Sequence, residues 1–154
     1  MAIPVEMFLP ATVPVIERSI ELHQSPERVW RALTEPEEIA RWFSPAATID
    51  LRPGGHAAFT WADDADDCGG TYEARVEWVE PHHRFAFRWA TLPNTPFEAA
   101  ATTLVEWELM ARPDGGTTLL VRESGFANEA DRSANDGGWL KETGELARYL
   151  DGAA

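Results

Sequence analysis

Residues 25–43, SPERVWRALTEPEEIARWF, predict two short helices that follow each other directly. Ser25 is a good N-cap, and Pro26 suits the first position of the first helix. Apolar side chains then recur at helical spacing, namely Val29, Trp30 and Leu33. This pattern predicts an amphipathic helix of about two turns.

We expect Thr34 to cap the second helix, which starts at Glu35 and Pro36. Its acidic first turn suits the positive end of the helix dipole. Its apolar stripe consists of Ile39, Trp42 and Phe43. Pro45 ends the helix. Helices this short are not stable alone, so the pair must pack against a larger hydrophobic face.

Alternating polar and apolar residues predict that this face is an antiparallel sheet. The expected strands are residues 15–23, 46–52, 56–61 and 70–80, a strand marked by Phe85, Phe87 and Trp89, and residues 103–111 and 117–125. Proline and glycine mark a turn at residues 53–55, and an Asp-Gly-Gly sequence marks another at residues 114–116. One face of the fourth strand is expected to carry Tyr72, Ala74, Val76 and Trp78.

The last predicted element is a helix over residues 133–150. Its apolar stripe consists of Trp139, Thr143, Leu146, Ala147 and Leu150. We therefore expect an α+β fold with one strand, two short helices, about six more antiparallel strands and a long C-terminal helix. One domain should span residues 1–154, with an irregular arm at residues 1–14. A curved sheet covered by a single long helix favours a cavity between the two.

The composition limits the classes of partner. The 154 residues carry 26 acidic and 13 basic side chains, a formal net charge of −13, so the surface would repel a phosphate backbone. We expect no nucleic-acid partner. We also expect no membrane insertion, because the sequence shows no apolar span and no basic amphipathic helix. Cys68 is the single cysteine, which excludes an internal disulfide and favours a reducing compartment. The prediction is a soluble, cytoplasmic protein.

Several segments carry a resemblance to a known family. In chain order they are PERVWRALTEPEEIARWF, IDLRPGGHAAF, GTYEARVEWVEPHHRFAFRW, GGTTLLVRESGF and GGWLKETGELARYL. Over about residues 15–150 the sequence closely resembles the bacterial family related to the C-terminal domain of the activator of the heat-shock-protein-90 ATPase. That family belongs to the START-like (SRPBCC), birch-pollen-allergen-like superfamily with the helix-grip fold. The resemblance implies a hydrophobic, lipid-binding-like cavity between the sheet and the long helix, and a link to the stress response.

Large aromatic residues are the main candidates for a ligand site. Those expected to face inward are Phe43, Phe59, Trp61, Tyr72, Phe87, Trp89, Trp107 and Trp139. Aromatic walls suit a flat or acyl-like apolar ligand. The alternative, that each of them fills the core, stays open because large side chains usually pack together. Thr143 is expected on the same inner surface, on the stripe of the last helix.

Glu123 is the polar candidate for the ligand site. If Leu119 and Val121 point inward along their strand, Glu123 does so too. A buried carboxylate needs a partner, and Arg18 or a ligand group would serve. The alternative is an ion pair at the rim or a strand-end residue in water.

The sequence predicts neither a metal nor another cofactor. The acidic run at residues 63–67 fails as an EF-hand loop, because Cys68 and Arg75 stand where oxygen ligands are needed. His82 and His83 are adjacent, so they point to opposite sides of an extended backbone. Ser124 has no histidine at triad spacing and does not lie in a nucleophile elbow. We therefore assign no catalytic residue.

We expect a protein that binds a small hydrophobic molecule, with residues 92–98 as a flap over the site. An enzyme of the cyclase, dehydratase or hydrolase kind is one alternative, using a polar pair such as Tyr72 and Glu123. A module that binds a chaperone or regulator through its acidic surface is another. A buried acid with a shifted pKa would favour the enzyme, whereas a solid core with an exposed apolar patch would favour the module. A homodimer also stays open.

Overall fold

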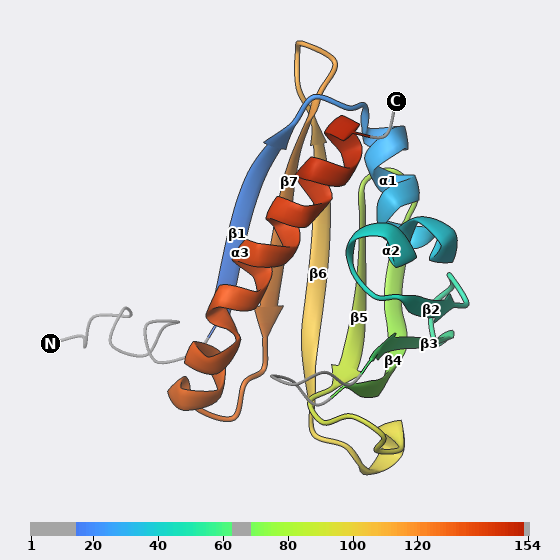
Figure 1. Ribbon diagram of the computed structural model, residues 1–154, viewed down its shortest axis with the longest axis vertical. Helices are drawn as coiled ribbons and strands as arrows, with labels where there is room; N and C mark the ends of the chain where they lie inside the picture. Colours follow the sequence, from blue (N-terminus) through green and yellow to red (C-terminus); the bar gives the residue numbers. More distant parts are fainter. Residues whose placement is uncertain (1–14, 63–68, 153–154) are drawn as a thin grey trace, which may run out of the picture.

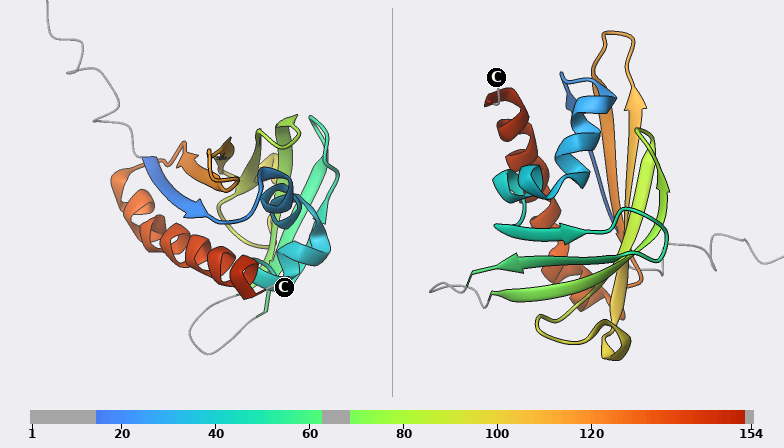
Figure 2. Two further views of the ribbon diagram at one scale, coloured as in Figure 1. Left: turned by 90° about the horizontal axis from the view of Figure 1, so that it is seen from above. Right: turned by 90° about the vertical axis from the view of Figure 1, so that its right-hand side faces the viewer.

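The computed structural model describes residues 15–62 and 69–152 of the chain. The expected N-terminal arm, the acidic run at residues 63–67 and Cys68 lie outside these residues. Seven antiparallel strands form one layer, in the order β1-β7-β6-β5-β4-β3-β2 (Figure 1). The two short helices and the long C-terminal helix lie on the same side of this sheet (Figure 2). The predicted α+β fold class is confirmed.

The elements follow the predicted order. Their bounds are β1 Val15–Leu22, α1 Pro26–Thr34, α2 Pro36–Trp42, β2 Ala46–Ile49, β3 His56–Trp61, β4 Gly70–Glu80, β5 Arg84–Ala90, β6 Thr102–Ala111, β7 Thr117–Ser124 and α3 Glu129–Gly152. A short 3-10 helix, η3 (Phe97–Ala99), lies in the loop between β5 and β6. Strand β2 ends before the predicted residue 52, because the turn into β3 already begins at Asp50.

The helical pair is capped as predicted at its start but not at its middle. The Ser25 hydroxyl accepts a hydrogen bond from the backbone N–H of Arg28 at 3.3 Å, which confirms the first N-cap. Thr34 is the last residue of α1, and its hydroxyl donates to a carbonyl one turn earlier at 2.7 Å. The predicted Thr34 cap of α2 is therefore wrong. Glu35 holds that position instead, because Pro36 restricts the residue before it to extended backbone.

Two tryptophans attach the helical pair to the sheet. Trp42 is buried, donates its indole N–H to the Ala32 carbonyl at 2.8 Å and meets Trp107 of β6 edge to face, with ring centroids 6.3 Å apart. Trp30 meets Phe85 of β5 in the same manner at 5.5 Å. Edge-to-face contacts are a preferred arrangement of aromatic rings. The pair therefore draws its stability from the sheet, as its short helices require.

Strand β4 departs from simple alternation. Its register on β5 shifts after Val76, so that Val76 faces Phe87 whereas Trp78 faces Ala86. The extra residue turns Trp78 onto the outer face of the sheet, where it borders a depression. The prediction that Tyr72 and Trp78 share one face is therefore wrong. A period-two pattern does not reveal a bulge that interrupts it.

Helix α3 packs along the inner side of the curved sheet, next to β1 (Figures 1 and 2). Its buried residues include the predicted stripe members Trp139, Thr143, Leu146 and Leu150. The helix begins earlier than predicted, where the Asn128 side chain accepts a hydrogen bond from the backbone N–H of Asp131 at 2.8 Å. Within the described residues, no helix is long and apolar enough to cross a membrane.

A polar link holds the C-terminal half of α3 to the helical pair. Tyr149 donates its O–H to Glu38 of α2 at 2.8 Å, and Arg28 of α1 donates to the same carboxylate at 2.6 Å. Burial by itself would raise the pKa of Glu38, but the hydrogen bonds from Tyr149 and Arg28 outweigh it, so this pKa is lowered. Three helices therefore meet at one ionised side chain.

Candidate functional site

A cavity of about 300 Å³ lies between the sheet and the N-terminal half of α3. Its aromatic walls are Trp61, Tyr72, Trp89 and Phe126, and its polar lining includes Thr103, Glu123, Asn135, Lys141 and Glu142. A recess of about 140 Å³ shares part of this lining and adds Phe43, Gly138 and Trp139. The cavity is at the small end of the range of about 300–1,000 Å³ that is typical for small-molecule sites.

Alternation along neighbouring strands brings the aromatic walls together. Trp61 of β3 meets Tyr72 of β4 edge to face, with ring centroids 5.5 Å apart, and Trp89 of β5 lies 6.2 Å from Tyr72. Phe43 stacks on Trp89 at 6.1 Å and on Trp139 at 5.9 Å. The Trp61 indole also donates to the Phe43 carbonyl at 2.9 Å. The rings thus hold one another in place.

Glu123 of β7 places a carboxylate in the cavity wall, where its residue is only 3% exposed. Its Oε2 accepts hydrogen bonds from the Trp89 indole at 3.0 Å and from the Thr103 hydroxyl at 2.5 Å. Its Oε1 accepts a hydrogen bond from the Trp139 indole at 2.8 Å. Strands β5 and β6 and helix α3 each supply one donor, so this carboxylate joins four elements of the fold.

The expected partner of Glu123, Arg18, is not among these donors. Arg18 lies opposite Val121 in the β1–β7 pairing and donates to the carbonyl of Glu17 at 2.9 Å, whereas Ile16 lies opposite Glu123. The hypothesis of an Arg18–Glu123 pair is therefore wrong. Indole and hydroxyl donors take its place, because β5, β6 and α3 converge on the carboxylate from the inner side of the sheet.

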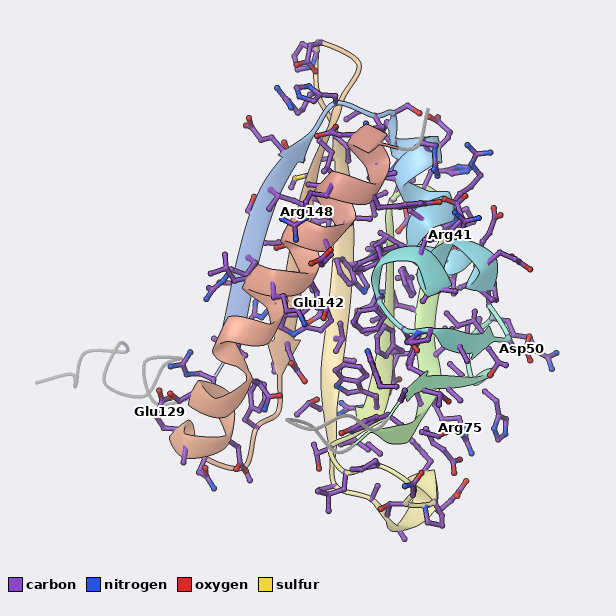
Figure 3. All side chains as sticks on the ribbon, in the orientation of Figure 1. Arg41, Asp50, Arg75, Glu129, Glu142 and Arg148 are labelled. Carbon is purple, nitrogen blue, oxygen red and sulfur yellow. The ribbon has the colours of Figure 1, made fainter. Side chains whose placement is uncertain are left out.

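Glu142 brings a second carboxylate to the cavity, from the middle of α3 (Figure 3). The pKa of Glu142 is raised to about 7, mainly by burial; Lys141 opposes this shift and the neighbouring Glu145 adds to it. A carboxyl group with this pKa is present in both protonation states near neutral pH. Such a group can bind a cation when ionised or donate a hydrogen bond when protonated.

The predicted site residues divide into two groups. Those that line the cavity or the recess are Phe43, Trp61, Tyr72, Trp89, Glu123 and Trp139. Those that are buried elsewhere in the core are Phe59, Phe87, Trp107 and Thr143. In the second group Thr143 uses its hydroxyl within α3, donating to the Trp139 carbonyl at 2.7 Å. For this second group, the alternative that each side chain fills the core is the one that the structure shows.

Sequence reasoning missed several lining residues. Thr103 had a detectable signal, because it precedes Val105 at the spacing of a shared strand face. Glu142 follows Trp139 at helical i,i+3 spacing, which places the two side chains on neighbouring rows of α3. Phe126 had no such signal. It comes after β7 has ended, where Gly125 adopts a φ of 90° that redirects the chain.

The predicted flap at residues 92–98 is held on the outer side of β4 instead. Arg75 of β4 forms an ion pair with Glu98 at 2.7 Å and lies 4.7 Å above the Phe97 ring. Asn94 accepts a hydrogen bond from the backbone N–H of Thr71 at 3.1 Å. The cavity is lined by Thr91, just before this loop, but none of residues 92–98 lines the cavity or the recess. The structure therefore does not support a flap there.

The described residues include no group of three or more His, Cys, Asp or Glu side chains that could hold a metal ion. The polar groups that line the cavity are two carboxylates, one amide, hydroxyl groups and the Lys141 ammonium. This set can bind a polar group of an organic ligand or transfer a proton.

Comparisons with known proteins agree with this architecture. The profile of the family described as Activator of Hsp90 ATPase homolog 1-like protein matches residues 23–151. A search of functionally curated proteins found no match. Among solved structures, the chain is similar to DynU16, a protein in the dynemicin biosynthetic locus, with 28% sequence identity and a TM-score of 0.74. That match covers 91% of this chain but 48% of DynU16, so the chain spans about half the length of that protein.

Two further structures match over nearly their whole length. MLL2253 from Mesorhizobium loti has 25% identity and a TM-score of 0.73, covering 89% of this chain and 96% of that one. NE0264 from Nitrosomonas europaea has 21% identity and a TM-score of 0.77, covering 95% and 99%, and this likeness shows the fold alone. The family profile spans most of the sequence, and the helix-grip arrangement predicted from the resemblance is confirmed. The chain belongs to the family of Activator of Hsp90 ATPase homolog 1-like proteins.

Proposed function

We propose that the protein binds a small, predominantly apolar molecule in the cavity between the sheet and α3. The observation that carries this proposal is a concave space of about 300 Å³ whose walls include Trp61, Tyr72, Trp89 and Phe126. Small-molecule sites are typically concave and carry aromatic walls of this kind. A ligand with a flat apolar body would fit against these rings.

The polar residues of the lining favour a ligand that binds in one orientation. Thr103 and Glu123 lie on the sheet side of the cavity, whereas Asn135 and Glu142 lie on the helix side. Polar groups placed beside aromatic walls fix the orientation of a ligand and give specificity. The ligand should therefore carry a polar group at one end of its apolar body.

Native mass spectrometry of protein purified from its own host tests the proposal, because it detects a retained small molecule directly. Ligand-observed NMR with a library of small aromatic and acyl compounds tests it independently. We expect saturable binding at one site per chain. A varied apolar library that yields no saturable ligand, together with protein that carries no small molecule, would contradict the proposal.

Trp61 and Trp78 provide a matched pair of variants for this experiment. Trp61 lines the cavity, whereas Trp78 lies on the outer face of the sheet. Trp61→Phe shortens the cavity wall and removes the indole donor to Phe43, so it should weaken binding. Trp78→Phe makes the same chemical change away from the cavity and should leave the affinity unaltered. Equal effects of the two variants on affinity would place the ligand elsewhere.

Acid–base catalysis in the same cavity is a second candidate function. The observation that favours it is the carboxyl group of Glu142, whose pKa is raised to about 7 by burial, in a cavity that also holds Tyr72 and Glu123. A group of this pKa suits proton transfer at neutral pH. The test is to incubate a compound recovered from the host protein with wild type and with Glu142→Gln. Conversion by the wild type alone, followed by mass spectrometry, would establish an enzyme.

A chaperone or regulator partner has less support. The large apolar side chains that are exposed among the described residues are Leu92, Met110 and Leu140. They lie in the β5–β6 loop, at the end of β6 and on α3, so they belong to separate parts of the fold (Figure 1). Docking sites for protein partners typically form contiguous apolar patches.

A further inference from the structure

The charge of Glu123 is not neutralised by its surroundings. All three of its hydrogen-bond donors, from Trp89, Thr103 and Trp139, are uncharged groups. Within the described residues no ion pair includes Glu123, although the residue is only 3% exposed and borders both the cavity and the recess. Buried carboxylates are usually matched by a cation. Oε1 accepts one hydrogen bond here and has a second lone pair for a donor from a ligand.

The aromatic walls beside this carboxylate form a corner rather than a stack. The rings of Trp61 and Tyr72 are inclined by 82°, those of Trp61 and Trp89 by 66°, and those of Tyr72 and Trp89 by 43°. The face of an aromatic ring attracts a cation, most strongly for tryptophan. The hydrogen bond from the Trp89 indole to Glu123 polarises that ring and adds to the attraction.

The charged groups around the helix side of the cavity also favour a cation. Glu142 and Glu123 of β7 both line the cavity and the recess. The other charged neighbours of Glu142 are Lys141 and Glu145 on α3 and Arg41 on α2, which borders the adjoining surface groove. Arg41 is exposed and borders the surface groove, whereas Lys141 is exposed but also lines the cavity. The cavity lining therefore carries two carboxylates and one ammonium group.

We propose that the cavity selects an organic cation, namely an ammonium group attached to an aromatic or similarly apolar body. The ammonium group lies between the carboxylates of Glu123 and Glu142, and the apolar body lies against Trp61, Tyr72 and Trp89. This inference rests on the proposed binding function and specifies its ligand class. Neutral and anionic molecules of the same shape lose the contact with the carboxylates and bind more weakly.

Three probes that differ in charge but share one body test the inference. They are 4-phenylbutylammonium, 4-phenylbutanol and 4-phenylbutyrate, titrated into the wild-type protein by calorimetry at pH 8. We expect the ammonium compound to bind about tenfold more tightly than the alcohol, the usual effect of one hydrogen bond to a charged group. The carboxylate compound should bind least. Alcohol binding as tight as ammonium binding would overturn the cation inference and leave the proposed function intact.

Glu142→Gln distinguishes attraction of the probe by the cavity from attraction by the general negative charge of the protein. This variant keeps the shape of the side chain and should reduce the preference for the ammonium probe severalfold, with little effect on the alcohol. Glu108→Gln is the matched control, because Glu108 is exposed and borders the depression on the outer face of the sheet. Equal effects of both variants on the ammonium probe would overturn the inference in favour of non-specific attraction.

The pH dependence gives an independent measurement. Glu142 has a pKa of about 7. An alkylammonium group has a pKa close to that of lysine, about 10.4, so it stays charged between pH 6 and pH 8. The affinity for the ammonium probe should therefore rise severalfold between pH 6 and pH 8 in the wild type, and this rise should be reduced in Glu142→Gln. A flat profile in the wild type would contradict the assigned role of Glu142. If none of the three probes binds, the cation inference falls. If the wider library and the host protein also yield no ligand, the proposed function falls with it.

Discussion

The indole nitrogen of Trp139 lies 2.8 Å from Oε1 of Glu123 and joins α3 to β7 inside the protein. Both side chains are buried, at 4% and 3% exposed. This is a charge-assisted hydrogen bond, which is stronger than one between neutral groups. It fixes α3 at the point where the recess and the cavity meet. The position of the helix and the shape of the cavity therefore depend on the same contact.

Glu123→Gln should lower the free energy of unfolding by about 1–3 kcal/mol. The carboxylate accepts hydrogen bonds at both oxygens, so one N–H of the new amide must face an indole or hydroxyl donor. Urea denaturation followed by tryptophan fluorescence measures the change. Glu108→Gln, on an exposed side chain, should stay within about 0.5 kcal/mol of the wild type. A loss at Glu123 no larger than this control would contradict the network.

Trp139 and Glu123 should be energetically coupled. A double-mutant cycle with Trp139→Phe and Glu123→Gln isolates their interaction, because phenylalanine keeps a ring but donates no hydrogen bond. We expect a coupling free energy of about 0.5–3 kcal/mol, the range found for residues in direct contact. Denaturation of the wild type, both single variants and the double variant measures it. Strict additivity of the two single effects would show that the 2.8 Å contact contributes nothing.

Trp42→Ala should lower the free energy of unfolding by about 3–5 kcal/mol. Its ring packs on Trp107, and its indole N–H bonds to the Ala32 carbonyl, so truncation leaves both a cavity and an unpaired acceptor. Thermal and urea denaturation measure the loss. Trp78→Ala is the size-matched control on the outer face and should cost clearly less. A thermal midpoint within a degree or two of the wild type for Trp42→Ala would contradict the role of Trp42 as an anchor of the helical pair.

Glu142 should make the stability fall as the pH rises through the acidic range. Its pKa is about 7 in the folded state against an ordinary value of 4.5, so between these values the folded state binds more protons than the unfolded state. The free energy of unfolding therefore decreases with pH in this window and levels off above about pH 7. Because the side chain is partly solvated, we expect a contribution of about 1–2 kcal/mol.

The difference in stability between wild type and Glu142→Gln, measured by urea denaturation from pH 5 to pH 8, isolates this contribution. Wild type should lose stability relative to Glu142→Gln as the pH rises. Glu108→Gln should run parallel to the wild type at each pH. A Glu142→Gln curve that also runs parallel to the wild type would show that burial does not perturb this carboxyl group.

Local sequence determined the elements of this fold. Ser25 and Pro26 marked the start of the first helix, and the alternation of Val105, Trp107 and Leu109 marked an inward strand face. These features depend on neighbours within one turn or one strand, which is the range that a periodic pattern covers. The alternation of Leu119 and Val121 indicated an inward Glu123 but left a position at the rim open, and the structure shows that Glu123 is buried. The family resemblance then indicated how the elements pack.

Only the tertiary structure determined which side chains contact one another. A local sequence pattern does not show which side chains converge across β5, β6, β7 and α3. It therefore suggested Arg18 as a partner of Glu123, whereas Trp89, Thr103 and Trp139 donate the hydrogen bonds to this carboxylate. The bulge that moves Trp78 outward depends on how β4 pairs with β5. Whether an inward aromatic ring fills the core, as Phe87 does, or borders a cavity, as Tyr72 does, depends on where α3 crosses the sheet. Each outcome results from distances between segments that are far apart in the chain, and a one-dimensional pattern contains no such distances.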